Sequence, residues 1–411
     1  MKDDSLGFTT RILHADRLGG VEHGSLHKPV HTSVAYGYED PREIAAVFQG
    51  ERAGFSYGRQ SNPTVDALAA KITSMEGGRG SVAFGTGMGA IGSLLLSMLR
   101  RGDHLVSSSF LFGNTNSLFG TFEAIGVEVD FVDATDAGAV AAALRPETRM
   151  VFVETIANPR TQIADLAGIG ALCAERGVVY VVDNTMTSPW LFQPRTVRAS
   201  LVVNALTKYI GGHGAALGGT VTDTGCFDWR AYPNIDERYR GLPPERWGLQ
   251  QLRKKGLRDL GASLGPEAAH HIALGAETLS LRMDRQCANA RALAEYLEAH
   301  EAVARVYHPS LPGHPQHDRA AELFRDFGAL LSFELVPSRD PFDVLEALKV
   351  VVSSSNLGDN RTLAIPVAHT IYHEMGAERR ASMGIDDSLI RISVGIEDTA
   401  DLLADFGAAL A

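Results

Sequence analysis

The sequence predicts an α/β protein with a largely parallel sheet, followed by a smaller α+β domain. Between residues 64 and 222, short apolar runs alternate with helical patterns, which is typical of a parallel sheet whose strands are joined by helices. From about residue 304, strands and helices mix without this alternation. A chain of 411 residues is long enough for two or three domains.

Residues 1–60 precede this pattern and show little hydrophobic periodicity. The segment combines scattered Gly, His and Pro with Tyr36, Tyr38, Phe48, Phe55 and Tyr57. Because free disordered tails are poor in aromatic residues, we expect this segment to wrap over a neighbouring body as an arm.

The strands expected in the sheet span residues 82–84, 105–108, 127–132, 150–154, 178–183, 201–204 and 219–222. Several of them are continuously apolar, as in a sheet that helices cover on both faces. The helices expected between them span residues 64–76, 90–100, 118–125, 140–144 and 169–175.

The second part of the chain begins with a polar, Pro-containing excursion at 229–248. A single long helix is expected from about 266 to 300, with only Gly275 inside it, and strands are expected at 328–335 and 389–394. The predicted organisation is an arm at 1–60, an α/β domain at 61–255 and an α+β domain at 256–411.

Composition excludes several classes of protein. The formal net charge of −11 argues against a nucleic-acid surface. The three cysteines, Cys173, Cys226 and Cys287, are too widely spaced for a disulfide framework or a Cys-x-x-Cys metal site. We see no signal peptide and no apolar run of membrane-spanning length. We therefore expect a cytoplasmic protein with neither a nucleic-acid nor a membrane partner.

Polar and reactive side chains follow the ends of the predicted strands, where open α/β sheets bind ligands. They are a glycine-rich turn at 85–90, then Glu154, Asn158, Asp183, Thr207 and Lys208. The turn fits both a dinucleotide fingerprint and a general phosphate cradle. A dinucleotide site needs an acid at the end of the second strand, where this chain has serines at 107–109. The NAD interpretation is thus disfavoured, and a turn that binds nothing is a third interpretation.

Asp183 and Lys208 each have a structural interpretation, which for a lone lysine is a solvated surface charge, and a chemical one. Asp183 ends a buried apolar run, so it either caps a helix or forms a salt bridge, or it pairs with a protonated pyridinium nitrogen. Lys208 follows a buried strand and is flanked by Thr207 and a glycine cluster. A lysine beside a cationic cofactor in a dry pocket has a lowered pKa, which makes it a nucleophile and a base.

Six motifs in this order resemble the Cys/Met-metabolism family of fold-type-I pyridoxal 5′-phosphate (PLP) enzymes. This family contains cystathionine γ-synthases and lyases, methionine γ-lyases and O-acylhomoserine sulfhydrylases. The motifs lie at 57–64, 87–88, 154–159, 182–185, 207–209 and 389–398. The stretches at 227–229, 257–262 and 277–283 are most similar to the O-acetylhomoserine sulfhydrylase branch.

The resemblance implies a seven-stranded, mainly parallel sheet, with PLP carried by Lys208 as a Schiff base. It places the phosphate on the N–H groups of Gly87 and Met88 and on the hydroxyl of Thr207. It places the ring between Asn158, Asp183 and a stacking residue, Phe112. It gives the substrate α-carboxylate to Arg391, with Asn158, Ser355 and Tyr57 also at the substrate.

The resemblance also implies a homodimer or homotetramer with sites shared between subunits. Tyr57 and Arg59 would reach the phosphate of the neighbouring subunit, a task suited to the arginine fork of donors.

Two departures from the family pattern concern chemistry. Ala205 stands where a serine is usual, so one phosphate hydroxyl is missing, and Phe112 replaces the stacking tyrosine. Phenylalanine can stack but cannot give or take a proton, although Tyr57 or Tyr372 could supply a hydroxyl. The stretch 365–373, which borders the substrate in the family, also differs from the usual pattern.

The function expected is γ-replacement or γ-elimination on a γ-substituted L-amino acid, with Lys208, Asp183, Phe112 and Tyr57 as the catalytic residues. Positioned acids contribute about 10²–10⁴-fold to such reactions. Carboxylates of O-acyl-L-homoserines, and the thioether of a sulfonium, leave without a proton, so an O-acyl substrate is preferred over methionine or cystathionine. A γ-lyase that releases a 2-oxo acid and ammonia is the alternative.

Interpretations from other classes are a nucleotide-dependent oxidoreductase and a PLP-free scaffold. A metal site is not expected, because the histidines at 308, 314 and 317 lie in a Pro/Gly loop and those at 369 and 373 lack the H-E-x-x-H order.

Overall fold

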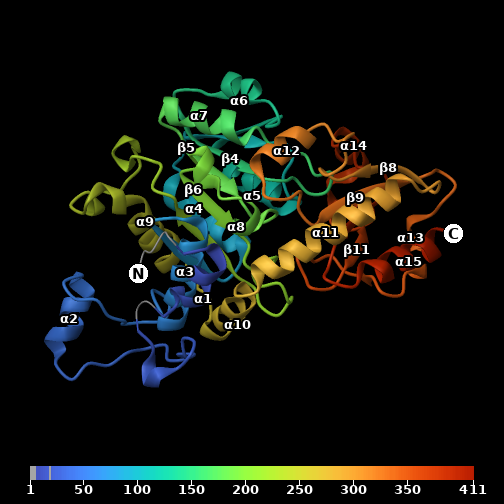
Figure 1. Ribbon diagram of the computed structural model, residues 1–411. Coiled ribbons are helices and arrows are strands. Elements are labelled where there is room, and N and C mark those ends of the chain that lie inside the picture. Colours follow the sequence, from blue (N-terminus) through green and yellow to red (C-terminus); the bar gives the residue numbers. More distant parts are fainter. Residues whose placement is uncertain (1–5, 18–19) are drawn as a thin grey trace.

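The computed structural model describes residues 6–17 and 20–411 and contains two sheets (Figure 1). Residues 1–5 and 18–19 of the expected arm lie outside the described part. In Figure 1 the larger sheet lies among helices, and the smaller sheet lies at the right, beside the C-terminus. The long helix α11 runs from the middle of the molecule along the smaller sheet.

The larger sheet has seven strands in the order β1-β7-β6-β5-β4-β2-β3. Their bounds are β1 Gly80–Phe84, β2 His104–Ser108, β3 Glu128–Val132, β4 Thr148–Glu154, β5 Val179–Asp183, β6 Leu201–Asn204 and β7 Gly219–Asp223. Only β7 runs antiparallel to its neighbours, β1 and β6. The predicted mainly parallel seven-stranded sheet is confirmed.

Both faces of this sheet are covered, because successive side chains of a strand enter two different hydrophobic clusters. In β4, Val151 and Val153 pack in one cluster and Met150 and Phe152 in the other. Strand β5 alternates in the same way. The continuously apolar runs in the sequence are therefore two interleaved faces, each buried under helices.

The helices of this part are α3 Pro63–Glu76, α4 Gly87–Met98, α5 Gly113–Ala124, α6 Ala137–Ala143, α7 Leu166–Arg176 and the short α8 Ser188–Leu191. All five predicted helices are present, but α4 to α7 begin three to five residues earlier than expected. Their first turns contain glycines, which hide a helix start in the sequence. Thr86 begins α4 because its Oγ1 accepts a hydrogen bond from Gly89 N–H at 2.8 Å.

The polar excursion after β7 consists of short turns. Their bounds are η3 Trp229–Ala231, η4 Glu237–Tyr239, η5 Pro244–Arg246, α9 Trp247–Gln251 and the π-helix η6 Leu252–Arg258. Another short turn, η2 Pro194–Val197, precedes β6.

The prediction of one long helix from 266 to 300 is wrong. The chain forms α10 Pro266–Ala276 and α11 Leu279–Glu298, with a break between them. At the break, the carbonyl of Gly275 accepts hydrogen bonds from Thr278 Oγ1 at 3.2 Å and from Arg282 Nη2 at 2.8 Å. Arg282 also donates to the carbonyls of Tyr209 at 2.7 Å and Ile210 at 3.1 Å, and so joins the break to the segment after Lys208.

The smaller sheet has the order β10-β11-β12-β9-β8. Its strands are β8 Val303–Tyr307, β9 Leu330–Leu335, β10 Val352–Ser353, β11 Leu363–Pro366 and β12 Leu389–Ser393. The helical segments around it are α12 His317–Leu323, α13 Pro341–Ala347, η7 Val367–His369, η8 His373–Met375, α14 Gly376–Ser382 and α15 Thr399–Leu410. The strands predicted near 328–335 and 389–394 are confirmed, whereas the other three have no clear signal in the sequence.

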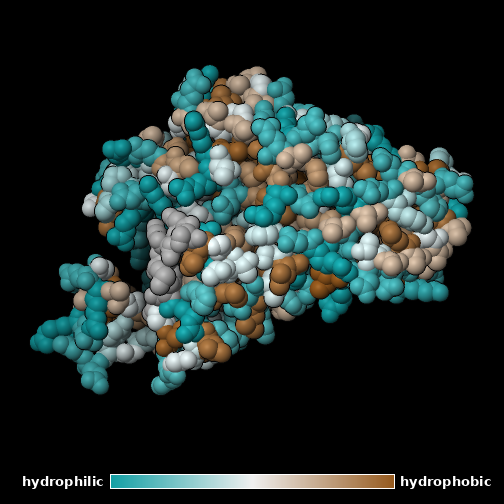
Figure 2. Space-filling model, in the orientation of Figure 1, coloured by the Kyte–Doolittle hydropathy of each residue, from teal (hydrophilic) through white to brown (hydrophobic). Residues whose placement is uncertain are grey.

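The arm is less irregular than expected. It contains α1 Phe8–Ala15, the 3₁₀ turn η1 Glu22–Gly24 and α2 Pro41–Gln49. Ile12 of α1 joins the core of the body, but no residue of α2 is buried. Figure 1 shows α2 projecting at the lower left, and in Figure 2 apolar residues interrupt the polar surface near the base of the arm.

Candidate active site

The carboxyl ends of β4, β5 and β6 and the N-terminus of α4 border a cavity of about 470 Å³. Loops of the smaller sheet close its other side. The predicted site residues that line this cavity are Gly87, Met88, Phe112, Asn158, Asp183, Thr207, Lys208, Ser355 and Arg391. Residues that the sequence did not single out also line it, among them Asn114, Thr185 and Asn356.

Lys208 is the amine of the cavity and is partly buried. Its Nζ donates a hydrogen bond to Asn356 Oδ1 at 2.7 Å. Burial, assisted by the positive charge of Arg391, lowers the pKa of Lys208 to about 8. A substantial fraction of the amine is therefore neutral near physiological pH, as a nucleophile or a base requires.

Asp183 and Glu154 form a pair of acids at adjacent strand ends, in register with each other. Asp183 accepts a hydrogen bond from Thr185 N–H at 2.9 Å, and Glu154 accepts one from Phe112 N–H at 2.8 Å. Burial raises the pKa of both carboxyl groups, and repulsion from Asp183 helps to raise that of Glu154 to about 8. Glu154 is thus largely protonated at neutral pH, and a ligand cation would favour the ionised form of Asp183.

The N-terminus of α4 offers backbone donors to the cavity. The N–H groups of Gly87 and Met88 belong to the first turn, for which a helix supplies no acceptors. Gly87 packs so closely that an added Cβ would lie 2.8 Å from the Cβ of Ala205. The hydroxyl of Thr207 lies nearby in the cavity wall and accepts a hydrogen bond from Gly218 N–H at 3.0 Å.

Asn158 contributes an amide oxygen, Oδ1, that is buried and has no hydrogen-bond partner among the described residues. Its backbone carbonyl accepts a hydrogen bond from the hydroxyl of Tyr372, which is fully buried. The hydroxyl of Tyr372 is therefore already hydrogen-bonded. The structure does not favour Tyr372 as the source of the hydroxyl that Phe112 lacks.

Arg391 is 1% exposed and lies on β12 at the edge of the cavity. Its Nη2 donates to the carbonyls of Ser355 at 3.0 Å and Asn356 at 2.9 Å. Its Nε is buried without a partner among the described residues. Burial lowers the pKa of Arg391 only to about 10, so the guanidinium stays charged and can bind a carboxylate.

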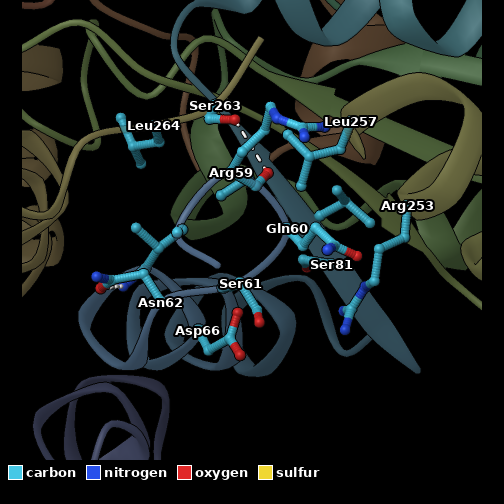
Figure 3. A pocket seen from close by; sticks show the side chains of 15 residues that line it. Arg59, Gln60, Ser61, Asn62, Asp66, Ser81, Arg253, Leu257, Ser263 and Leu264 are labelled. Carbon is cyan, nitrogen blue, oxygen red and sulfur yellow. Dashed lines mark hydrogen bonds between the residues drawn. The ribbon is translucent and has the colours of Figure 1, made fainter. Parts of the chain in front are cut away.

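Tyr57 and Arg59 do not line this cavity within one chain. The guanidinium of Arg59 lies 5.4 Å from the ring centre of Tyr57 and donates to the carbonyl of Arg258. Arg59 instead borders a separate small cavity of about 20 Å³, together with Asp66 and Arg253 (Figure 3). Their predicted contact with the phosphate of a neighbouring subunit stays a prediction.

The histidines do not form a metal centre in the described chain. No group of three or more His, Cys, Asp or Glu side chains in residues 6–17 and 20–411 is arranged to hold a metal ion. In that same part of the chain, no helix is both long and apolar enough to cross a membrane.

The cavity provides complementary groups for PLP. The helix N-terminus can bind a phosphate, and Asp183 can pair with a protonated ring nitrogen. The amide of Asn158 has a polar atom without a partner among the described residues. Lys208 supplies an amine for a covalent bond, and Phe112 supplies an apolar ring at the wall.

Comparisons with known proteins agree with this chemistry. The family model for Cys/Met metabolism PLP-dependent enzymes matches residues 9–411. The chain is 35% identical to an L-methionine gamma-lyase of Fusobacterium nucleatum over 98% of both chains. It is 36% identical to O-acetyl-L-homoserine sulfhydrylase 1 of Thermus thermophilus, over 98% of this chain and all of that one.

Solved structures extend the agreement to three dimensions. A Campylobacter jejuni structure assigned as an O-acetylhomoserine (thiol)-lyase contains N′-pyridoxyl-lysine-5′-monophosphate. It superposes with a TM-score of 0.93 at 29% identity, over 98% of this chain and 100% of that one. A cystathionine gamma synthase of Xanthomonas oryzae pv. oryzae in complex with cystathionine has a TM-score of 0.87 at 32% identity, over 98% of both chains.

These likenesses cover nearly the whole chain and therefore decide between the classes of protein that the sequence left open. The dinucleotide-dependent oxidoreductase and the PLP-free scaffold are both set aside, and the fold is that of the fold-type-I PLP enzymes. The chain belongs to the Cys/Met metabolism family of PLP-dependent enzymes.

Proposed function

We propose that this enzyme performs γ-replacement on an O-acyl-L-homoserine, with a thiol or a related nucleophile as acceptor. The observation that carries the proposal is the cavity itself, which unites Lys208 and Arg391 with a phenyl ring, Phe112, at the predicted stacking position. The relatives named above as a sulfhydrylase and a γ-lyase support γ-chemistry.

Bound PLP acts as an electron sink for the bonds at the substrate α-carbon. Arg391 lines the cavity, and its Nε has no hydrogen-bond partner among the described residues, so its guanidinium binds the substrate carboxylate and orients the α-carbon toward Lys208. The Nζ of Lys208, with a pKa of about 8, takes the α-proton, and Asn356 Oδ1 accepts a hydrogen bond from the resulting ammonium. Asp183 carries the negative charge that pairs with the protonated ring nitrogen.

The cavity selects substrates by the leaving group on the γ-carbon. Phe112 offers no proton, and the hydroxyl of Tyr372 is bonded to the carbonyl of Asn158. A carboxylate leaves without a proton, whereas a thiolate does not leave easily. Lys208 and Arg391 are the basic side chains that line the cavity in the described chain, and both have other tasks. We therefore favour a neutral acyl group, such as acetyl, over an anionic one.

Phe112→Tyr tests the proposal. We expect the wild type to show a higher kcat/KM for O-acetyl-L-homoserine than for L-methionine. The added hydroxyl should raise turnover of the thioether more than turnover of the ester, because only the thioether needs a proton at its leaving group. Thiol-replacement product and 2-oxo acid are measured in parallel. Equal effects on both substrates, or a wild type that prefers methionine, would contradict the proposal.

A γ-lyase is the second candidate function, since the Fusobacterium nucleatum relative is an L-methionine gamma-lyase. Release of 2-oxo acid from the ester without incorporation of the thiol would favour it.

We also propose that the enzyme is a cytoplasmic homodimer or homotetramer. Its buried free thiols, Cys173 and Cys287, suit a reducing compartment.

A further inference from the structure

A network of buried polar side chains lies behind the strand ends that border the cavity. At its centre is Glu76, the last residue of α3. Its Oε1 accepts hydrogen bonds from the amide nitrogens of Asn184 at 3.0 Å and Asn204 at 2.7 Å. All three side chains belong to residues with no exposed surface.

The network continues to a third strand. The side-chain oxygen of Asn184 accepts a hydrogen bond from the hydroxyl of Thr187, and this hydroxyl lies 2.9 Å from that of Thr155. Thr155 follows β4, Asn184 follows β5 and Asn204 ends β6. One connected set of hydrogen bonds therefore joins three adjacent strand ends to the end of α3.

Each of these residues has a neighbour in the sequence that lines the cavity. The pairs are Thr155 with Glu154, Asn184 with Asp183, and Asn204 with Ala205. Adjacent side chains in an extended chain point to opposite sides. Each strand end therefore places one residue at the cavity and that residue's neighbour in the network. Lys208 follows three residues after Ala205.

Stability alone does not account for the carboxyl group of Glu76. Its second oxygen, Oε2, is buried without a hydrogen-bond partner among the described residues. Burial raises the pKa of Glu76 to about 7, against the lowering effect of the two amides. An apolar side chain of similar volume often stabilises such a position at least as well, so a buried polar hub is better explained by specificity of geometry.

We propose that Glu76 is a positioning residue, which holds the ends of β5 and β6 so that Asp183 and Lys208 keep their spacing across the cavity. Glu76 touches neither substrate nor cofactor and acts only through these two residues. The proposal requires that Asp183 and Lys208 face PLP, but it does not depend on which γ-substituent is transferred.

Glu76→Met tests the proposal in the holoenzyme, because it keeps the side-chain volume and removes the acceptor. We expect kcat to fall about tenfold with KM changed less than twofold, since Arg391 lies outside the network. The visible circular dichroism of the bound cofactor should weaken, because it reports ring orientation. Glu76→Gln, which keeps an acceptor oxygen, should restore most of both signals.

Thr148→Val is the matched control. The hydroxyl of Thr148 lies 2.8 Å from His104 Nδ1, and both residues are buried at the amino ends of strands β4 and β2, far along the sheet from the cavity end of the strands. It should lower the unfolding temperature and leave kcat and the dichroism unchanged. If Glu76→Met does not fold, Thr187→Val breaks the network at its other end and carries the same expectations.

The proposal would be overturned if the network variants kept the kcat and the dichroism per bound cofactor of the wild type. It would also be overturned if Thr148→Val lost as much kcat and dichroism as they do. The dichroism and the cofactor content can be read without substrate. A failure of the γ-replacement assignment would therefore leave this test intact.

Discussion

Lys71 is buried and Lys208 is partly buried, and their neighbours give these two lysines different roles. The side chain of Lys71 is fully buried, and its Nζ lies 2.9 Å from Glu277 and 3.4 Å from Asp16. Lys208 meets a neutral amide, that of Asn356, and the positive charge of Arg391. Carboxylate partners stabilise an ammonium, whereas burial beside a cation favours a neutral amine. The surroundings of Lys208 suit it for chemistry and those of Lys71 for structure.

This difference predicts opposite outcomes for two substitutions. Lys208→Ala should remain folded but lose both turnover and the covalently held cofactor, as peptide mapping after borohydride reduction would show. Lys71→Met should keep the covalent cofactor on Lys208, yet lose about 3–5 kcal/mol of unfolding free energy, because the buried carboxylate of Asp16 loses its cation. Cofactor reduced onto any other lysine in the wild type would refute the assignment.

Glu76 predicts a dependence of stability on pH. Its pKa of about 7 in the folded state lies above the ordinary value of 4.5, so the folded state binds this proton more tightly than the unfolded chain. The contribution is complete below about pH 4.5 and is lost as pH rises through about 7. The unfolding free energy of the wild type, relative to Glu76→Gln, should therefore fall by roughly 3 kcal/mol between pH 4 and pH 8. A constant difference across this range would show that Glu76 does not titrate in the fold.

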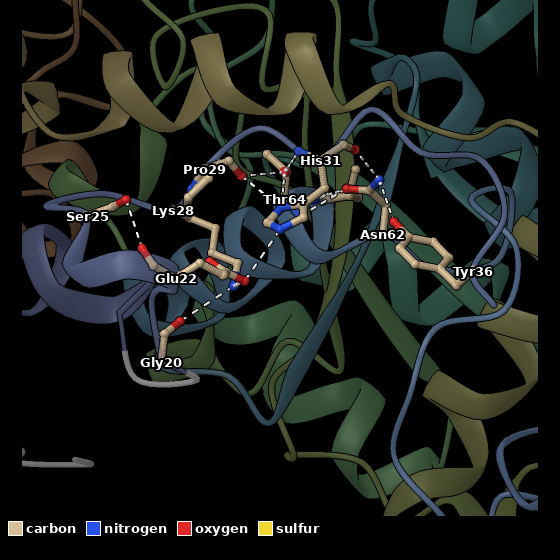
Figure 4. Close-up of polar contacts among 10 residues, drawn as sticks. Gly20, Glu22, Ser25, Lys28, Pro29, His31, Tyr36, Asn62 and Thr64 are labelled. Atoms are coloured by element: carbon tan, nitrogen blue, oxygen red, sulfur yellow. Dashed lines mark hydrogen bonds and ion pairs between the residues drawn. The ribbon is translucent and has the colours of Figure 1, made fainter. Parts of the chain in front are cut away.

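Among the elements, α3 links the arm to the interior. Asn62 caps its N-terminus by accepting hydrogen bonds from Thr64 N–H at 2.9 Å and Val65 N–H at 3.3 Å. The same side chain donates to the carbonyl of His31 at 2.7 Å and to the hydroxyl of Tyr36 at 3.3 Å (Figure 4). One amide thus serves both the helix and the arm.

Asn62→Ala should therefore lower the unfolding free energy by more than the loss of a helix cap alone. Loss of a cap costs about 1 kcal/mol, and the unpaired carbonyl of His31 adds to this loss. Limited proteolysis should also cut the arm faster. Asp136→Ala is the control, since Asp136 caps α6 with one hydrogen bond to Gly138 N–H at 2.8 Å. Equal losses in the two variants, with an unchanged rate of arm cleavage, would show that the arm does not depend on Asn62.

At the scale of the whole molecule, the arm has features that contacts within one chain do not explain. Leu26, Val34 and Phe48 are 85%, 66% and 67% exposed, and such a set of apolar side chains is typical of a surface that a partner covers. Tyr57 and Arg59 precede α3 and do not line the Lys208 cavity of their own chain. Both observations support a second copy of this chain as the partner.

Subunit mixing tests that arrangement. Arg59→Ala and Lys208→Ala proteins should each be inactive or weak alone. If Arg59 of one subunit completes the Lys208 site of the other, random exchange should restore about a quarter of wild-type activity, because half the dimers are mixed and each has one intact site. No recovery after verified exchange, or a fully active monomer, would contradict site sharing.

The sequence is sufficient to predict the large sheet and the residues at its edge. Asp183 and Lys208 stand out because polar residues end buried apolar runs, and this signal is local. Asn356 has no such signal, because its contact with Lys208 spans 148 positions and depends on how the two sheets pack. The role of Glu76 is hidden for the same reason, since its partners lie 108 and 128 residues away.

The broken helix shows a different limit of prediction. The periodicity of residues 266–300 is continuous, whereas the break coincides with the hydrogen bonds of Arg282 to the carbonyls of residues 209, 210 and 275. The proposed domain boundaries at 60 and 255 stay predictions. Ala205 and Phe112, in contrast, are departures that the sequence alone makes visible, and both line the cavity.

The contacts of Arg282 also bear on how this enzyme could acquire new substrates. Its guanidinium joins the two halves of the chain through main-chain oxygens of residues 209, 210 and 275, and this joint requires glycine at position 275, where an added Cβ would collide with the carbonyl of Gly211. Cavity-lining residues such as Asn114, Ser355 and Ile371 make no part of it. Selectivity and architecture can therefore vary independently, and libraries randomised at these three positions should yield mostly folded, cofactor-loaded proteins with altered preferences.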